Sequence, residues 1–190
     1  MDTSCSLDDL VDFFSSLNKL EVVDLEGYDQ LSDEVIEALV VNNPNLYHLN
    51  IKHTTYDIPL LTGRSLSIIT YNSPQITHID IGNLRVFTND DILIISKCSK
   101  LKYANFECTL IKDSFLARLA NDCPDLEDLN LSRCVLIKSA GIEAFLDKAS
   151  KAKLKHLDIR NCGAFDTEDY GGSIADHFNQ KYPHIDIVAK

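Results

Sequence analysis

The sequence predicts an α/β solenoid in which short parallel strands form one face and helices form the other. Three observations lead to this fold class. Apolar triplets recur along the chain at spacings of 25 to 30 residues, which is typical of a repeat array. Amphipathic helical patterns with capping residues lie between the triplets. A unit of one strand and one helix cannot bury its own apolar face, so the units are expected to stack on each other.

Each repeat unit begins with apolar residues at its first, fourth and sixth positions. The unit that starts at Leu126 shows this frame, with Leu129 and Leu131. Five further units share it: Leu20, Val23 and Leu25; Leu46, Leu49 and Ile51; Ile76, Ile79 and Ile81; Leu101, Ala104 and Phe106; Leu154, Leu157 and Ile159. The frame predicts six strands whose fourth and sixth positions point into the core. Ile185 and Ile187 suggest a partial strand at the end of the array.

Helices are predicted between the strands. Apolar residues at helical spacing mark the segments 31–41, 88–96, 112–120 and 138–146. Ser32 is expected to cap the first of these helices. Thr88 stands three residues before Asp91, a spacing that predicts a capping-box start.

The first residues predict one more helix. Within residues 6–17 a single apolar face consists of Leu7, Leu10, Val11, Phe14 and Leu17. Repeat arrays need a cap over their first unit, and this helix is suited to that role. We therefore expect a capping helix over residues 1–19 and an array of about six repeats plus a partial C-terminal strand over residues 20–190.

Two segments depart from the repeat. Residues 53–66 contain Pro59 and Gly63, which interrupt the helical pattern, and residues 163–174 contain Tyr170 before two glycines. Long loops at repeat junctions often carry partner contacts, but an idle insertion explains either segment equally well.

The composition is that of a folded acidic protein. Of the 190 residues, 45% are apolar and 25% are charged, and the formal net charge is −11. Such acidity argues against nucleic acid as a partner, because phosphate binding needs clustered Lys and Arg, and it suits a protein partner with a basic surface. The apolar runs are too short for a membrane helix, and the acidic start MDTSCSLDDLVDFF has none of the Lys or Arg of a signal peptide. We therefore expect a cytoplasmic or nuclear protein, a monomer on its own, that does not bind membranes.

The segment CPDLEDLNLSRC, residues 123–134, resembles the cysteine-containing subclass of leucine-rich repeats. Cys123, Pro124, Leu126, Leu129, Leu131 and Cys134 match the whole family pattern. Cys98, Leu101 and Phe106 match the front of another unit, with Cys108 one place early, and Leu154, Leu157, Ile159 and Cys162 match the back of a third. Asn43-Pro44 and Ser73-Pro74 replace Cys-Pro elsewhere. The resemblance implies a horseshoe with a concave parallel sheet and buried, reduced thiols, among which Cys134 and Cys162 lie close together.

The resemblance also implies a function. This subclass is typical of F-box proteins, the substrate receptors of cullin-type ubiquitin ligases, and it occurs in proteins similar to the antagonist of mitotic exit network. The F-box itself is missing, because the residues before Leu20 are few and contain no proline. We expect a protein-interaction module that recognises substrates for a ubiquitin ligase and contacts ligase components. The alternative is a structural or assembly factor that docks into a larger complex.

The residues of the concave face are the candidate binding site. Strand residues alternate between the two faces of a sheet, so the third, fifth and seventh positions of each unit should point away from the core. The candidates are His48, His78, Tyr103, Asp128 and His156 at the third position, Asn50, Asp80, Asn105, Asn130 and Asp158 at the fifth, and Lys52, Glu107 and Arg160 at the seventh.

Each column has two interpretations. The fifth-position Asp and Asn residues could accept hydrogen bonds from a partner, or they could simply pair with one another in a crowded sheet. His48 and His78 are expected to stand side by side, either as solvated side chains or as a shared metal site or charge switch. Tyr103 is the best candidate for a contact, because exposed tyrosine is enriched at interfaces.

Catalytic and cofactor motifs are missing. The sequence contains no G-x-S-x-G, no Walker loop and no H-E-x-x-H. None of its six cysteines lies in a C-x-x-C pair, and zinc-site spacings are missing as well. We expect no enzymatic activity, no cofactor and no metal.

Overall fold

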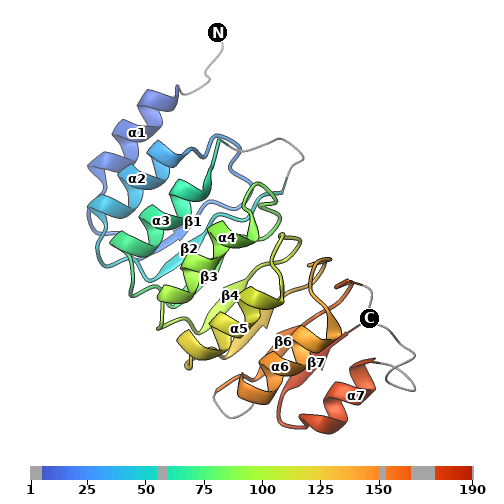
Figure 1. Cartoon of the computed structure of the whole chain (residues 1–190). Helices are drawn as coiled ribbons and strands as arrows, with labels where there is room; N and C mark the ends of the chain where they lie inside the picture. Colours follow the sequence, from blue (N-terminus) through green and yellow to red (C-terminus); the bar gives the residue numbers. More distant parts are fainter. Residues whose placement is uncertain (1–5, 55–59, 150–152, 164–173, 190) are drawn as a thin grey trace.

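The computed structural model describes residues 6–54, 60–149, 153–163 and 174–189, and its strands form one parallel sheet (Figure 1). The sheet has seven strands in sequence order, so that each strand pairs with the next one along the chain. They are β1 (Val22–Asp24), β2 (His48–Asn50), β3 (His78–Asp80), β4 (Tyr103–Asn105), β5 (Asp128–Asn130), β6 (His156–Asp158) and β7 (Asp186–Val188). The predicted α/β solenoid is confirmed.

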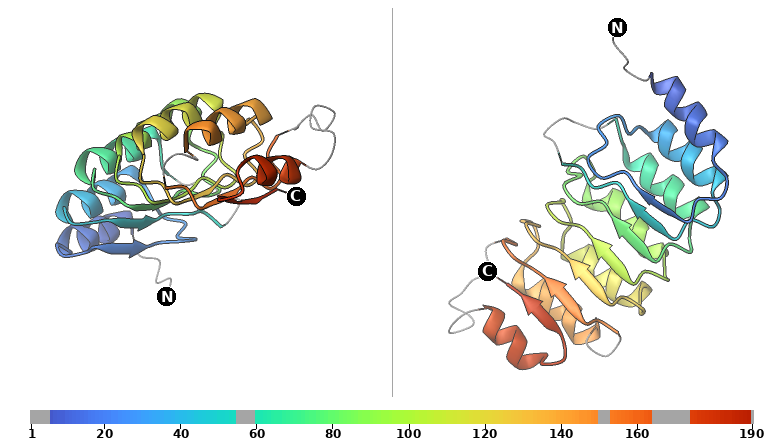
Figure 2. Two further views of the ribbon diagram at one scale, coloured as in Figure 1. Left: turned by 90° about the horizontal axis from the view of Figure 1, so that it is seen from below. Right: turned by 180° about the vertical axis from the view of Figure 1, so that it is seen from behind.

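Helices cover one face of this sheet. They are α1 (Leu7–Ser16), α2 (Asp33–Asn42), α3 (Gly63–Asn72), α4 (Asn89–Ile92), which continues as the 3₁₀ helix η1 (Leu93–Lys97), α5 (Asp113–Asp122), α6 (Ser139–Ala149) and α7 (Ile174–Lys181). Helices α2 to α6 lie side by side on the same side of the sheet, and α7 flanks β7 (Figure 2). The opposite side, which the described helices leave uncovered, is called the concave face below.

The repeat frame forms the core between these layers. Of the framed residues, sixteen are buried, whereas Leu20 and Leu25 are only partly buried. Both exceptions belong to the first unit, which has a sheet neighbour on one side only. Each apolar triplet therefore anchors its strand to the helices, as the alternation of side chains predicts.

The helices begin where the sequence predicts. The Ser32 hydroxyl accepts a hydrogen bond from the Val35 N–H at 3.3 Å, and Thr88 and Asp91 form a reciprocal capping box. Gly63 does not interrupt the helix of its repeat, contrary to prediction, but is the first residue of α3. A side chain at Gly63 would collide with the Asp91 carboxylate, so the glycine makes room for the capping box of the next repeat. Residues 55–59, which include Pro59, and residues 164–173, which include Tyr170, lie outside the described residues.

Helix α1 packs against α2 at the first end of the array (Figure 1). Ser6 and Asp9 form a capping box at its start. Leu10 and Phe14 are buried, while Leu7 at the first position of the helix is 39% exposed. The predicted apolar face of α1 therefore packs against the array mainly through Leu10 and Phe14. The division into a cap over residues 1–19 and an array over residues 20–190 remains our proposal.

The first residue of one helix binds the start of the next. Asp33 accepts a hydrogen bond from the Thr62 N–H at 2.9 Å, and the side chain of Asp113 accepts one from the Lys138 N–H, also at 2.9 Å. The acceptor stands at the first position of its own helix in both cases. These bonds satisfy helix N–H groups that have no intrahelical partner, and they tie neighbouring repeats together.

We predict that Asp33→Asn lowers the free energy of unfolding by about 2 kcal/mol at neutral pH, because hydrogen bonds to a buried charge are strong. Burial alone would raise the pKa of Asp33, but hydrogen bonds from Ser65 and Thr62 together lower it. A lowered carboxylate pKa stabilises the fold above the pKa of the unfolded chain, and this stabilisation is lost as the pH falls through the folded value. Urea denaturation at several pH values should therefore show the variant and the native chain converging in acid. Glu34→Gln, an exposed neighbour, is the control, and an equal loss there would contradict the prediction.

The cysteines lie inside the array. All five that fall within the described residues are free thiols. The Cys134 thiol donates to the Phe106 carbonyl and the Cys162 thiol to the Leu131 carbonyl, each at 3.0 Å, so both bind the backbone of the preceding repeat. Burial raises the pKa of Cys162 to about 12, and Cys134 adds to the effect, in agreement with the predicted proximity of the two thiols. Thiols with such high pKa values are poor nucleophiles, which suits a packing role.

Candidate functional site

Three rings stand in a row on the concave face. The strand register places His48 beside His78 and His78 beside Tyr103. The two imidazoles stack with centroids 5.3 Å apart, and the ring of Tyr103 lies 6.0 Å from that of His78, with interplanar angles of 15° and 20°. The predicted proximity of His48 and His78 is confirmed, and Tyr103 extends the pair into a row of three.

The fifth-position residues hold the turns that follow the strands. Each side chain accepts a hydrogen bond from the backbone N–H two residues later, at 2.9 to 3.0 Å, and the six acceptors are Asp24, Asn50, Asp80, Asn105, Asn130 and Asp158. This is the local bonding that short Asp and Asn side chains favour. Asn50, Asn105 and Asp158 are buried as well, which supports the architectural interpretation of this column. Partner contacts by these residues stay a prediction.

Neighbouring members of the column also bind one another. The Asn50 amide donates to Asp24 Oδ1 at 3.0 Å, and the Asn105 amide donates to Asp80 Oδ2 at 2.8 Å. An Asp beside an Asn can form such a bond, whereas two carboxylates side by side would repel. The alternation of Asp and Asn along the first four strands thus has a structural cause.

The seventh position carries an ion pair that spans a repeat. Lys52 Nζ lies 3.1 Å from Glu107 Oε2, although Gly82 occupies the repeat between them. The Lys52 stem passes beside Gly82, where a Cβ would approach its side chain to 3.3 Å. The glycine therefore opens the path along which Lys52 reaches Glu107. Burial alone would lower the pKa of Lys52, but Glu107, Asp80 and Glu26 together raise it.

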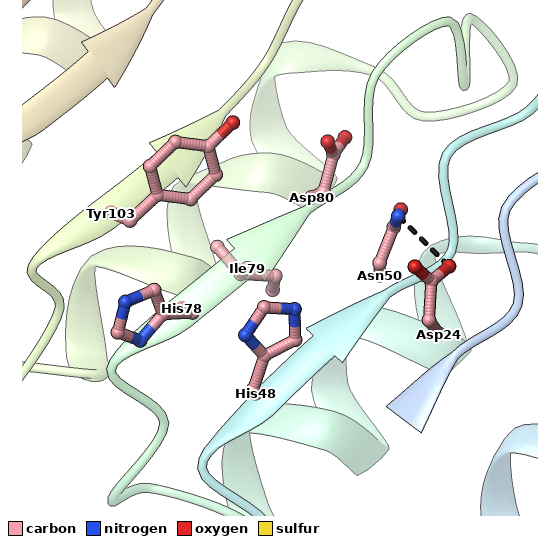
Figure 3. Close-up of a pocket in the computed structure, with 7 residues that line it drawn as sticks. All are labelled: Asp24, His48, Asn50, His78, Ile79, Asp80 and Tyr103. Carbon is pink, nitrogen blue, oxygen red and sulfur yellow. Dashed lines mark hydrogen bonds between the residues drawn. The ribbon is translucent and has the colours of Figure 1, made fainter. Parts of the chain in front are cut away.

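A shallow pocket opens between the ring row and the fifth-position column (Figure 3). It is lined by Asp24, His48, Asn50, His78, Ile79, Asp80 and Tyr103. Burial raises the pKa of Tyr103 to about 12, and the charges of Asp80, Asp128, Glu107 and Glu26 add to the effect. Burial also raises the pKa of Asp80, and burial together with His48 and Lys102 lowers the pKa of His78. The pocket therefore holds carboxylates, and the lowered pKa of His78 favours its neutral form.

The candidates on β5 and β6 lie apart from this pocket. His156 Nδ1 lies 2.8 Å from Asp186 Oδ2 on β7, and Arg160 binds Asp158 through its Nε and Nη2 groups. Both pairs are formed within this half of the sheet. Burial raises the pKa of Asp128, on β5. Of the thirteen predicted residues, five line the pocket: His48, Asn50, His78, Asp80 and Tyr103. Lys52, Asn105 and Glu107 belong to the same repeats without lining it, and the other five belong to the repeats of β5 and β6.

Three residues that complete these groups were not among the candidates. Asp24 lines the pocket, Thr77 lies 2.8 Å from His78 Nδ1 through its hydroxyl, and Asp186 pairs with His156. Asp24 and Asp186 occupy the fifth and third positions of their units, so the repeat frame gave a signal for both. Thr77 precedes its strand, and no pattern in the sequence marks it.

Within the part of the chain that the structure describes, His, Cys, Asp and Glu side chains form no group of three that could hold a metal ion. None of the helices there is both long enough and apolar enough to cross a membrane.

Comparison with known proteins supports the fold. No protein-family model matches the chain, and no curated protein matches it. A chain of the Rad7–Elc1 complex from yeast is similar over 82% of this chain, with a TM-score of 0.63 and 17% identity. An internalin (inlF) from Listeria monocytogenes is similar over 83%, with a TM-score of 0.46 and 20% identity. This chain spans 38% and 37% of the lengths of those two chains. With its parallel sheet and alternating helices, it has the fold of a leucine-rich-repeat solenoid.

Proposed function

We propose that this chain is a non-enzymatic protein-binding module of the cysteine-containing leucine-rich-repeat subclass, and that it recognises its partner on the concave face. The pocket beside the row formed by His48, His78 and Tyr103 is the observation that carries the proposal. These rings are half-buried and stand on short strands, so a partner meets a rigid surface. Rigid aromatic side chains are the residues on which interface affinity most often depends.

Affinity capture from cell extract with the double variant His48→Ala/Tyr103→Ala tests the proposal. We expect the capture of a specific partner to fall by about tenfold or more, because hot-spot aromatics contribute most of the binding free energy. Tyr71→Ala is the matched control, since Tyr71 is an aromatic residue on α3, away from the sheet, and is 85% exposed. A partner that is retained by the folded double variant and lost by Tyr71→Ala would move the site to the helical side.

The ubiquitin-ligase link is the finer part of the proposal. It is supported by the family resemblance of residues 123–134 and by the fold that this chain shares with a chain of the Rad7–Elc1 complex. Substrate recognition requires that a cullin or its adaptor is recovered with this chain in addition to the substrate. If capture yields a defined complex without ligase components, the assembly-factor alternative is favoured. A single species of the mass of the chain in gel filtration of the extract would contradict that alternative.

A further inference from the structure

We propose that the concave pocket binds the guanidinium group of an arginine side chain that the partner protein supplies. This inference rests on the proposed function and specifies the chemistry of its site. The pocket is defined by Asp24, His48, Asn50, His78, Asp80 and Tyr103.

The carboxylates of the pocket have capacity for a cationic donor. Asp24 accepts its two hydrogen bonds, from the Glu26 N–H and the Asn50 amide, at Oδ1, so that Oδ2 remains available. Asp80 accepts from the Gly82 N–H and the Asn105 amide. Within the described part of the chain, neither carboxylate forms an ion pair with a Lys or Arg. Lys52 acts on Asp80 through its charge but forms its ion pair with Glu107, so the donors bound to the two carboxylates are neutral.

Asn50 contributes no free hydrogen-bonding group to the pocket. The Asn50 amide donates to Asp24, and its oxygen accepts from the Lys52 N–H at 3.0 Å, so both ends of this side chain are occupied.

The tautomer of His78 depends on its neighbour. The Thr77 hydroxyl lies 3.2 Å from the Tyr47 carbonyl and 2.8 Å from His78 Nδ1, and its one proton serves only one of them. When the hydroxyl donates to the carbonyl, its oxygen accepts from His78 Nδ1–H, and Nε2 is then a hydrogen-bond acceptor. The pocket thus offers acceptors from Asp24 and Asp80, and from His78 in that tautomer.

Arginine is the ligand that best matches this set. Its guanidinium has five N–H donors in one plane, has no acceptor, and forms bidentate bonds with carboxylates. Its flat group can also stack on an aromatic ring plane to plane, a geometry that the ammonium group of lysine lacks. A metal ion is a weaker match, since the described residues hold no group of three His, Cys, Asp or Glu side chains arranged for one.

Titration with N-acetyl-arginine amide, followed by NMR of the imidazole and Tyr103 ring protons, tests the assignment. We expect saturable shifts of these signals. N-acetyl-citrulline amide, which has the same shape without the charge, should bind about tenfold more weakly, because a partly desolvated charge pair contributes more than an exposed one. Equal binding of citrulline, or of N-acetyl-lysine amide, would overturn the guanidinium assignment.

The variant Asp24→Asn isolates the charge. It preserves the shape of the side chain and the oxygen that accepts the existing bonds, and we expect about tenfold weaker binding of the arginine probe. Asp12→Asn is the control, because Asp12 is exposed on α1 and does not line the pocket, and it should change binding by less than about twofold. An unchanged affinity in Asp24→Asn would overturn the assignment.

The probe separates this inference from the proposed function. If His48→Ala/Tyr103→Ala loses the partner while the arginine probe fails to bind the native chain, the arginine assignment is overturned and the binding module stands. If the probe binds as expected but the double variant retains its partner in full, the concave face is not the partner's surface, and the assignment of the pocket to a partner's arginine is overturned together with the proposed function.

Discussion

Replacing Phe106 by alanine is expected to lower the free energy of unfolding by about 4 kcal/mol, the cost typical of a large aromatic deletion in a closed core. Phe106 is fully buried at the end of β4, in the middle of the array. Its ring meets that of Phe115 on α5 edge to face, with centroids 4.9 Å apart. The deletion removes both this contact and the packing between sheet and helix layer, at a place where neither the repeat before nor the repeat after can fill the cavity.

The large expected effect follows from the residue sizes in this repeat, where a small side chain stands beside an unusually large one. The fourth position is Val, Leu or Ile in the other units but the smaller Ala104 in this one. The sixth position is Leu or Ile in the other units but the larger Phe106 in this one. Both side chains are fully buried. We infer that the large ring of Phe106 fills the space that the small Ala104 leaves. Ala104→Leu should then be tolerated better beside Phe106→Leu than beside native Phe106, a coupling that a double-mutant cycle measures.

Urea denaturation of Phe106→Ala, followed by circular dichroism, measures the loss. Phe13→Ala is the matched control, because Phe13 on α1 is 55% exposed, and it should change the free energy by no more than about 0.5 kcal/mol. A loss in Phe106→Ala below about 1 kcal/mol would contradict the packing account, because it would mean that the cavity collapses freely.

The fold was predictable because its signals are periodic. The frame of apolar residues determines which face of each strand is buried. Because the same frame recurs in successive units, it also determines the strand register, so that His48 and His78 could be predicted as neighbours from the sequence. Local signals were equally reliable, as the Thr88–Asp91 capping box shows. The capping signal lies within one repeat, and the register is obtained by comparing the same position in two repeats.

The details of the site depend on contacts that periodicity does not encode. Lys52 reaches Glu107 past Gly82, where a Cβ would crowd the Lys52 stem, and the tautomer of His78 depends on the hydroxyl of Thr77. The hydrogen bonds between the fifth-position side chains and their own backbone likewise depend on the turn after each strand. Such features arise from side-chain conformations that are selected by neighbours, some adjacent in the sequence and some two repeats away, and a column of residue types gives no information on them.

Asn43→Ala is expected to lower the free energy of unfolding by about 3 kcal/mol, because it removes a buried amide that binds partly buried backbone groups of Leu17 and Leu20. Asn43 is fully buried after the end of α2, at the place where Cys123 stands in its own unit. Its amide donates to the Leu17 carbonyl at 2.9 Å, and its oxygen accepts from the Leu20 N–H at 2.8 Å. One side chain thus fastens the chain between α1 and β1 to the first complete repeat.

The same place in the next repeat supplies the control. Ser73 is also fully buried, and within the described residues its hydroxyl has no hydrogen-bond partner. Ser73→Ala should therefore leave the stability unchanged or raise it by up to about 1 kcal/mol, since a buried polar group without a partner destabilises the fold. Urea denaturation of Asn43→Ala and Ser73→Ala measures the two changes in the free energy of unfolding. Equal losses would contradict the role given to the Asn43 amide. Asn43→Cys, which introduces the residue found at the same place before β5, should recover little of the loss, because a thiol is a weak donor and cannot replace both the N–H and the oxygen of the amide.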